Sequence, residues 1–369
     1  MVGSRSRFRY FSNPIFFSGR GKGGGFAAPA VLHHWQLRTS WSETCLLVRM
    51  LAVALEGGRV MLVDEAAGDV KWEIGAHSNL SISRAVMSPG GRFVASVGSR
   101  DDHWILWDAA SGAAHRMGSD GTGACICGDI HQSLEACPVV AHNTAGLLTL
   151  AFSPNGQRLA TGGKDGSVIL WDTQTGEAEQ SLQGSSQKIW SLSFSASGEK
   201  VASTGFQGSI WVWNATTGEL LRTIPEAHYG RSASWVHFSP RDERSLASVG
   251  GGQIQLWDAE SGKLTKLMLG HFFVAFSPDG GSIATTGADV REVHLVDAEA
   301  GTERVRMVGH RCQVTSACFS PEGSKLASGS NDGTCKVWDS STGALLRTIE
   351  VGRRVQSVGW GRDWVRDTS

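Results

Sequence analysis

Short runs of alternating apolar and small residues recur along the chain, each interrupted by a turn. In one copy, residues 326–330 (LASGS) alternate, Asn331, Asp332 and Gly333 supply a tight turn, and residues 334–338 (TCKVW) resume the alternation before Asp339. Alternation with a period of two is typical of a β-strand, and a turn of this composition joins antiparallel neighbours. The pattern therefore predicts a β-hairpin as the building unit of the fold.

The same hairpin unit occurs seven times between residues 51 and 339. Its copies close at Asp64, Asp108, Asp172, Asn214, Asp258, Asp297 and Asp339, in steps of 44, 64, 42, 44, 39 and 42 residues. A period of about 40 to 45 residues is typical of four-stranded propeller blades. The one long step predicts an insertion, which we place at about residues 113–141.

Two further strands complete each unit. An apolar run precedes a turn that usually contains Ser-Pro, as in residues 148–156 (LTLAFSPNG), and a Gly-ended turn leads into a fourth strand, as in residues 342–349 (TGALLRTI). Proline at the second turn position and glycine at the fourth both suit a type I turn. Each repeat is therefore expected to hold four short antiparallel strands.

Over about residues 44–360, these turns and strands resemble the WD-repeat β-propeller family. The resemblance rests on the SPxG turn, the LASG-like strand, the Asp-Gly turn, the Trp-Asp pair and the Thr-Gly turn, which recur at fixed offsets. It implies an all-β fold, a seven-bladed β-propeller of four-stranded antiparallel blades, in which radial repetition protects the sheet edges. Residues 361–369 are expected to form a C-terminal tail.

The ring must close between its two ends. The first copy, residues 51–64, has no convincing inner strand before it, whereas residues 355–360 (VQSVGW) read as an inner strand without a blade. We predict that 355–360 pairs with 51–64 and closes a seven-bladed ring. The alternatives are an eighth blade cut short, or residues 45–49 as the inner strand.

Composition and charge exclude some functions. The 369 residues have a formal net charge of −1, which gives no whole-chain field that would attract nucleic acid or an anionic membrane. The seven cysteines are odd in number and irregularly spaced, which favours a reduced intracellular compartment. No apolar run approaches the roughly 18 residues that span a bilayer. We expect a soluble cytoplasmic or nuclear protein.

Residues 1–42 differ from the rest of the chain. They contain six basic residues, no acidic residue and no strand or helix period. A disordered basic Gly/Arg-rich tail or a misassigned gene start is one interpretation. The others are a transit peptide within residues 1–34 that directs organelle import, and an arm that contacts RNA through Arg and Phe.

The resemblance implies buried side-chain networks, because in this family a His before the inner strand, a Ser or Thr, a hairpin Asp and a Trp are commonly linked. Complete sets are His77, Ser96, Asp101 and Trp107; His142, Thr161, Asp165 and Trp171; and His310, Ser328, Asp332 and Trp338. The set recurs in several blades, whereas an active site would occur once. A buried Trp needs a partner for its N–H, and a buried carboxylate needs donors. We interpret the sets as structural.

Four blades depart from this pattern. The fourth has Ser185 for His and Gln207 for Asp, the fifth has Gly252 at the turn beside His228, Ser248 and Trp257, and the sixth has His271, Thr285 and Asp289 but Val296 for Trp. The first has none of the four residues. We expect these blades to be the softer part of the ring.

Motifs for catalysis, nucleotides and metals are missing or weak. The sequence contains no phosphate-binding loop, HExxH, GxSxG or kinase set. Cys125, Cys127, His131 and Cys137 lie in the expected insertion, but their spacing is not that of a familiar zinc site. We expect a protein that is not an enzyme and that has no cofactor, metal or small-molecule substrate.

The resemblance implies that partners dock over the face that carries the second-to-third-strand hairpins. Arg and aromatic residues anchor interfaces, and the expected contacts at hairpin tips and inner strands are Arg100, Lys164, Trp190, Phe206, Phe272, Arg311 and Asn331. For each, a purely structural or solvated role is the alternative. We expect a non-catalytic protein-interaction scaffold or adaptor in a multiprotein complex. The alternative is a ribonucleoprotein or ribosome-assembly factor that contacts RNA through the basic tail.

Overall fold

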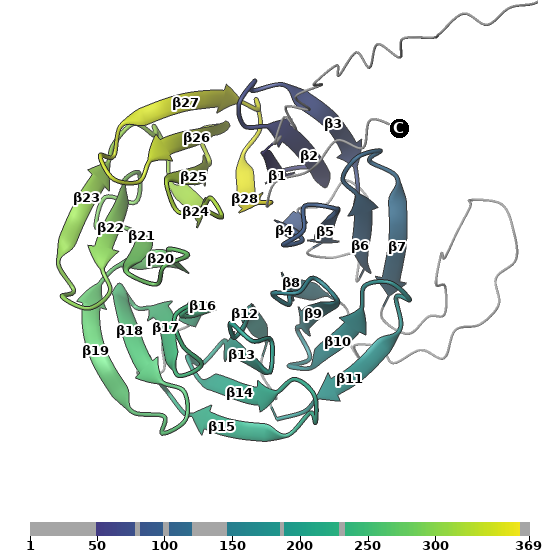
Figure 1. The fold of residues 1–369 in the computed structure, drawn as a ribbon, viewed down its shortest axis with the longest axis vertical. Helices are drawn as coiled ribbons and strands as arrows, with labels where there is room; N and C mark the ends of the chain where they lie inside the picture. The colour runs from purple at the N-terminus through teal and green to yellow at the C-terminus, as the bar shows by residue number, and fades with distance from the viewer. Residues whose placement is uncertain are drawn as a thin grey trace, which may run out of the picture. The chain divides into compact units, whose positions relative to one another are not determined.

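A computed structural model of the protein describes residues 49–77, 82–98, 103–119, 146–184, 188–228 and 233–361. These residues form 28 β-strands in seven four-stranded antiparallel sheets, which stand as blades around a central opening (Figure 1). The described residues include no helix. The predicted all-β, seven-bladed propeller is therefore confirmed.

The innermost strand of each blade borders the central opening. From blade one to blade seven these strands are β28 (Val355–Trp360), β4 (Ile82–Met87), β8 (Leu147–Phe152), β12 (Ile189–Phe194), β16 (Ala233–Phe238), β20 (His271–Phe276) and β24 (Val314–Phe319).

The other three strands follow outward in each blade. The second strands are β1 (Met50–Leu55), β5 (Phe93–Gly98), β9 (Arg158–Gly163), β13 (Lys200–Gly205), β17 (Ser245–Gly250), β21 (Ser282–Thr286) and β25 (Lys325–Ser330). The third are β2 (Arg59–Asp64), β6 (His103–Asp108), β10 (Val168–Asp172), β14 (Ile210–Asn214), β18 (Gln253–Asp258), β22 (Val293–Asp297) and β26 (Thr334–Asp339). The outermost are β3 (Val70–Gly75), β7 (Ala114–Ser119), β11 (Ala178–Leu182), β15 (Leu220–Ile224), β19 (Leu264–Leu269), β23 (Glu303–Met307) and β27 (Leu345–Glu350).

The ring closes through the two ends of the described chain. Strand β28 pairs antiparallel with β1, with Leu51 opposite Trp360 and Val53 opposite Val358. This confirms the predicted pairing of 355–360 with the first copy and excludes the eighth blade among the described strands. The closing strand also joins the core, because Val355 and Val358 pack with Leu51 and Val337.

The core lies between neighbouring blades. One buried cluster joins Ala52 and Val60 of blade one to Val94 and Ile105 of blade two. Second strands are covered on both sides, so all six residues of β5 are buried, whereas four of the five residues of β15 at the rim are exposed. Burial on both faces explains why the second strands are rich in small and apolar residues.

Part of the expected insertion at 113–141 is ordinary blade structure, because Ala114–Ser119 is β7, the outer strand of blade two. The sequence expectation therefore began the insertion too early. The rest of that segment, with Cys125, Cys127, His131 and Cys137, lies outside the described residues, as do the 1–42 tail and residues 362–369. Among the described residues, no helix is long and apolar enough to cross a membrane.

Candidate protein-binding face

The turns of each blade reach two opposite faces of the ring. Because neighbouring strands run antiparallel, the turn between the second and third strands lies on the same face as the start of the inner strand. The described turns of this kind are residues 56–58, 164–167, 206–209, 251–252, 287–292 and 331–333, and we call their side the hairpin face. The Ser-Pro turns and the Gly-ended turns lie on the opposite face.

Blade seven holds a complete side-chain network below the hairpin face. The indole N–H of Trp338 donates to Ser328 Oγ at 2.8 Å, and Ser328 Oγ lies 2.8 Å from His310 Nε2. His310 Nδ1 lies 2.9 Å from Asp332 Oδ2. A single assignment of donors and acceptors satisfies every group: the Ser328 hydroxyl donates to His310 Nε2, and the Nδ1–H of His310 donates to the Asp332 carboxylate.

Burial and hydrogen bonds fix the charges in this network. Burial lowers the pKa of His310, although the hydrogen bond and charge of Asp332 work in the other direction. Burial also opposes the ionisation of Asp332, but hydrogen bonds from Thr334, the backbone N–H of Arg311 and His310 outweigh it and lower its pKa to about 2. At neutral pH the hairpin turn is therefore held by a charged carboxylate.

In three other blades, the described residues show parts of the same network. In blade two, Ser96 Oγ lies 3.0 Å from His77 Nε2 and accepts the N–H of Trp107 at 3.0 Å. In blade five, Ser248 makes the corresponding contacts with His228 at 2.8 Å and Trp257 at 2.9 Å. In blade three, Trp171 donates to Thr161 at 2.8 Å, and Asp165 accepts from Ser167. Asp101 and His142 lie outside the described residues.

Blades four and six satisfy their polar groups differently. In blade four, the N–H of Trp213 donates to the carbonyl of Gln183 at 3.0 Å, and Ser203 Oγ has no partner among the described residues. In blade six, a single residue, Gly270, joins β19 to β20, so His271 begins a strand and its carbonyl accepts from Thr285. The sequence analysis was therefore wrong to place His271 at the position of the loop histidines of the other blades.

The central channel opens on the hairpin face in a cavity of about 470 Å³. All seven inner strands or their leading residues line it: Ile82, Ser83, Arg84, Leu148, Trp190, Ser234, Trp235, Phe272, Gln313, Thr315 and Gln356. Trp190 is 39% exposed and Phe272 is 42% exposed. Trp190 is therefore not a core residue, and we call this opening the channel mouth.

Arg84 and Trp235 meet inside the channel mouth. The guanidinium carbon of Arg84 lies 4.2 Å from the ring centre of Trp235, within the range of a cation–π contact. Arg84 Nη1 also donates to Thr149 Oγ1 at 3.2 Å. Strands β4, β8 and β16 thus hold one cation in common, and β4 and β16 stand on opposite sides of the opening (Figure 1).

Small polar residues occupy the equivalent place on most other inner strands. The pairing of each inner strand with its second strand shows which positions correspond. Arg84 and Trp235 occupy the position that holds Thr149, Ser191, Ser316 and Ser357 in other blades. These hydroxyls join neighbouring blades, as where Ser357 Oγ accepts from Ala85 N at 2.8 Å and Ser316 Oγ accepts from Val358 N at 2.9 Å. The large side chains at 84 and 235 are therefore departures from the inter-blade pattern.

The other expected contacts that lie among the described residues are found around the hairpin face. Phe206, at a hairpin tip, is 53% exposed, and Lys188 Nζ lies 6.0 Å from its ring centre. The backbone N–H of Lys164 donates to the carbonyl of Gly146, and that of Asn331 donates to Gln313. Arg311 is exposed, and its backbone N–H donates to Asp332 Oδ2 at 2.8 Å. Arg100 lies outside the described residues.

Phe272 is held in an unusual backbone conformation. Its φ is 56°, in the left-handed region that is costly for a residue with a Cβ. The one-residue connection between β19 and β20 leaves little chain to turn into the inner strand. The short connection accounts for the strain, and it presents an aromatic ring at the channel mouth.

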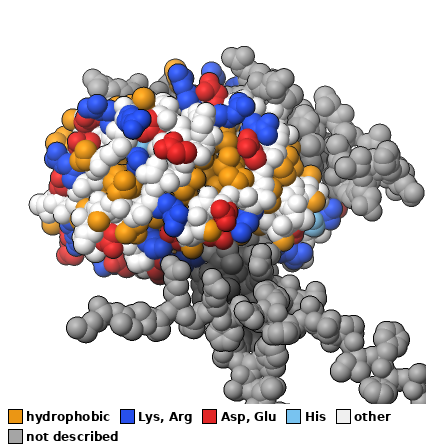
Figure 2. Space-filling model, turned by 90° about the horizontal axis from the view of Figure 1, so that it is seen from above, with side chains coloured by type: hydrophobic (Ala, Val, Ile, Leu, Met, Phe, Trp, Pro, Cys, Tyr) orange, Lys and Arg blue, Asp and Glu red, His pale blue; other side chains and the backbone are white. Residues whose placement is uncertain are grey.

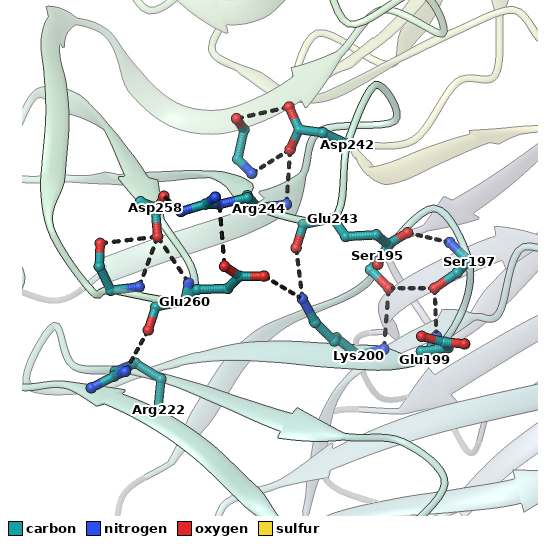
Figure 3. Close-up of polar contacts among 12 residues, drawn as sticks. Ser195, Ser197, Glu199, Lys200, Arg222, Asp242, Glu243, Arg244, Asp258 and Glu260 are labelled. Atoms are coloured by element: carbon teal, nitrogen blue, oxygen red, sulfur yellow. Dashed lines mark hydrogen bonds and ion pairs between the residues drawn. The ribbon is translucent and has the colours of Figure 1, made fainter.

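The opposite face carries paired charged side chains where blades four and five meet (Figure 3). Lys200 Nζ donates to the carbonyl of Glu243 at 3.1 Å and lies 3.7 Å from Glu260. Arg244 pairs with Asp258 at 2.8 Å and with Glu260 at 3.3 Å. The Lys200 contacts join blade four to blade five, whereas both Arg244 pairs lie within blade five. Because these pairs are exposed to solvent, each is expected to contribute little to stability.

The side of the ring in Figure 2 has acidic and basic side chains interspersed, with hydrophobic areas between them. It shows no large patch of one sign. No three His, Cys, Asp or Glu side chains of the described residues are grouped so as to hold a metal ion.

Sequence reasoning missed several residues of the channel mouth, above all Arg84 and Trp235. A signal was present for Arg84, because it is the one charged residue in an inner strand that otherwise consists of Ile, Ser, Ala, Val and Met. No local pattern could show that it meets Trp235, because the two strands belong to blades two and five.

Three segments, at residues 135–172, 176–214 and 301–339, match the WD domain, G-beta repeat. The nuclear distribution protein PAC1 of Coccidioides posadasii (strain C735) is 30% identical over 236 residues, covering 54% of this chain and 49% of that protein. A guanine nucleotide-binding protein subunit beta of Arabidopsis thaliana is 24% identical over 216 residues, covering 56% and 48%.

A serine-threonine kinase receptor-associated protein of Dictyostelium discoideum is 35% identical over 101 residues, which cover 27% of this chain and 34% of that protein. The matched part thus spans about half or less of each of these three relatives. The chain therefore contains WD repeats, is similar to these relatives over part of its length, and forms a seven-bladed β-propeller of four-stranded blades.

Proposed function

We propose that the protein is a non-catalytic interaction scaffold, an adaptor that holds partner proteins within a multiprotein complex by its hairpin face. The single observation that carries this proposal is the placement of exposed aromatic residues. The described large hydrophobic residues that are exposed include three aromatics, Trp190, Phe206 and Phe272, and all three lie on the hairpin face. The other exposed residues of this class are Val or Leu.

Aromatic residues are enriched at the centres of protein interfaces because they bury a large area with few rotatable bonds. Trp190 and Phe272 border one cavity, and Phe206 stands at the tip of the hairpin between β13 and β14. A partner that covers the channel mouth would contact these rings first, with Lys164, Arg311 and Asn331 around them. On the opposite face, the charged side chains between blades four and five are already paired with one another.

The names of the relatives are consistent with a role in assemblies, since one is a G protein subunit and another is receptor-associated. The His, Ser and Trp sets below the hairpin face support a scaffold rather than an enzyme. Related sets occur in blades two, five and seven, and the indole N–H of each Trp satisfies a hydroxyl. We assign these sets to stability.

The test is affinity capture with the full chain from the source cells, followed by binding measurements with each purified candidate. One variant carries Trp190→Ala and Phe272→Ala. A matched control carries Lys200→Ala and Arg244→Ala on the opposite face of blades four and five. We expect the first variant to lose at least tenfold in affinity for a direct partner, since hot-spot residues cost more than about 1.4 kcal/mol.

The control variant is expected to bind as the wild type does. Equal loss in both variants, or loss only in the control, would overturn the proposal. Capture of RNA that is released by salt would favour the RNA-contacting alternative instead.

A further inference from the structure

The channel mouth contains one charge and no described counter-charge. Of the described residues that line it, Arg84 is the only charged one, and the others are apolar, aromatic, hydroxyl or amide side chains. No ion pair between Arg84 and a described carboxylate occurs. Burial lowers the pKa of Arg84 to about 10, so the guanidinium still carries its charge at neutral pH.

The contacts of Arg84 use only part of its capacity. A guanidinium has five N–H donors, and one of its nitrogens, Nη1, donates to Thr149. The face of the guanidinium lies against Trp235, which supplies attraction but accepts no in-plane hydrogen bond. Donors at the edge of the guanidinium therefore lack protein acceptors among the described residues.

A neighbouring histidine does not change this charge balance. Burial, and then the charge of Arg84, lower the pKa of His237 to about 4, so its ring is neutral at neutral pH. The site therefore presents a single positive charge in a partly enclosed, aromatic setting. Removing a charge from water without a counter-ion is costly, so an incoming anion would relieve that cost.

The geometry points to a carboxylate as the group that fits. A guanidinium and a carboxylate match each other in a planar, two-bonded arrangement, and one unit charge offsets the other. A phosphate monoester would bring about two negative charges against one cation. The cavity of about 470 Å³ has room for a few side chains, and Trp190 and Phe272 at its rim suit apolar neighbours of the acid.

We propose that the channel mouth binds an Asp or Glu side chain of the docked partner, paired with Arg84 and flanked by apolar residues that contact Trp190 and Phe272. This inference rests on the proposed function, because it names the chemistry of the segment that a protein partner would insert. It gives the scaffold a specificity for acidic segments that the aromatic rim alone would not provide.

The test uses the full chain to select from a display library of random twelve-residue peptides. Selected peptides are synthesised with each acid in turn replaced by its amide, and their affinities are measured for wild type, Arg84→Gln and Arg84→Lys. For one acid we expect roughly a tenfold or greater loss on wild type, the size expected for a charged hydrogen-bonded pair. On Arg84→Gln the acid and the amide peptide should bind equally.

Arg84→Lys keeps the charge but not the two-bonded geometry, so its preference for the acid should be intermediate. Melting temperatures of the variants identify any that fail to fold, and the comparison of acid and amide on wild type needs no variant. If peptides lose binding in Trp190→Ala but never depend on an acid, the proposed face stands and the carboxylate inference fails. If no peptide depends on Trp190, the proposed function itself fails.

A last comparison uses a peptide in which phosphoserine replaces the required Asp or Glu. If this peptide binds more tightly than the peptide with the acid, and the gain needs Arg84, the site is one for phosphate and the carboxylate inference is overturned. Weaker binding of the phosphoserine peptide supports the carboxylate.

Discussion

Arg84 and Trp235 form a bridge across the central channel, with the guanidinium carbon of Arg84 4.2 Å from the ring centre of Trp235. Arg84 reaches the neighbouring blade through Thr149, and both side chains are much larger than the Ser and Thr residues that join blades at equivalent places. Together they line the same cavity as Trp190 and Phe272 and add a charge and an aromatic ring to it. The hairpin face therefore combines an apolar rim with a polar centre, which suits selective binding of protein segments.

Two serines in the same structural position should respond differently to substitution. Ser328→Ala removes the acceptor of Trp338 and the partner of His310, and leaving such buried groups unsatisfied costs about 1 to 3 kcal/mol. Ser203→Ala removes a hydroxyl that has no partner among the described residues, so stability should change little or rise. Urea unfolding of both variants checks the difference, and equal losses would contradict it.

Acid should destabilise the ring before its carboxylates titrate. His228 and His237 have their pKa values lowered by burial to about 4 in the folded state, below the ordinary value of 6.5. Between pH 6.5 and 4 the unfolded chain therefore binds more protons, and the stability present above pH 6.5 is lost as pH falls toward 4. The loss is on the order of 2 to 3 kcal/mol for each histidine.

Unfolding free energies measured from pH 7 to pH 4 check this prediction. The variant His237→Gln should show a shallower pH dependence than the wild type, because one titrating group is gone. An unchanged slope would mean that His237 is protonated equally easily in both states.

Removal of the closing strand should open the ring. A chain that ends at Gly352 lacks β28, so the inner edge of β1 is unpaired and Val355 and Val358 leave the core. We expect a large fall in melting temperature or a loss of cooperative unfolding. A chain that ends at Gly361 keeps every described strand and is the control. Similar melting of the two would contradict the closure.

A substitution of Phe272 should affect partner binding more than the stability of the fold. Phe272→Gly relieves the left-handed backbone, and this relief of about 1 kcal/mol partly offsets the burial that is lost with a side chain that is 42% exposed. The variant should therefore lose little stability while binding partners less well. Phe206→Gly is the control, because its φ is not positive and no strain is relieved. A clear loss of stability in Phe272→Gly would show that the ring supports the fold.

The parts of the fold that depend on local spacing could be predicted from the sequence. The 39- to 44-residue steps, the Gly-ended turns and the apolar run at 355–360 were sufficient for seven blades and for their closure. The His271 alignment failed because it ignored the length of the connection before β20. The channel mouth was only partly predicted, since Trp190 and Phe272 follow from their type and place, whereas the Arg84–Trp235 contact depends on how distant blades meet.

The most direct measurement of the central claim is site-specific photo-crosslinking to a partner from the two faces of one blade. A photoreactive phenylalanine replaces Phe206 on the hairpin face or Thr217 in the exposed turn between β14 and β15 on the opposite face. Position 206 should crosslink to the partner, and Trp190→Ala should abolish that product, while position 217 should give none. Crosslinking from position 217 with none from position 206 would contradict the account.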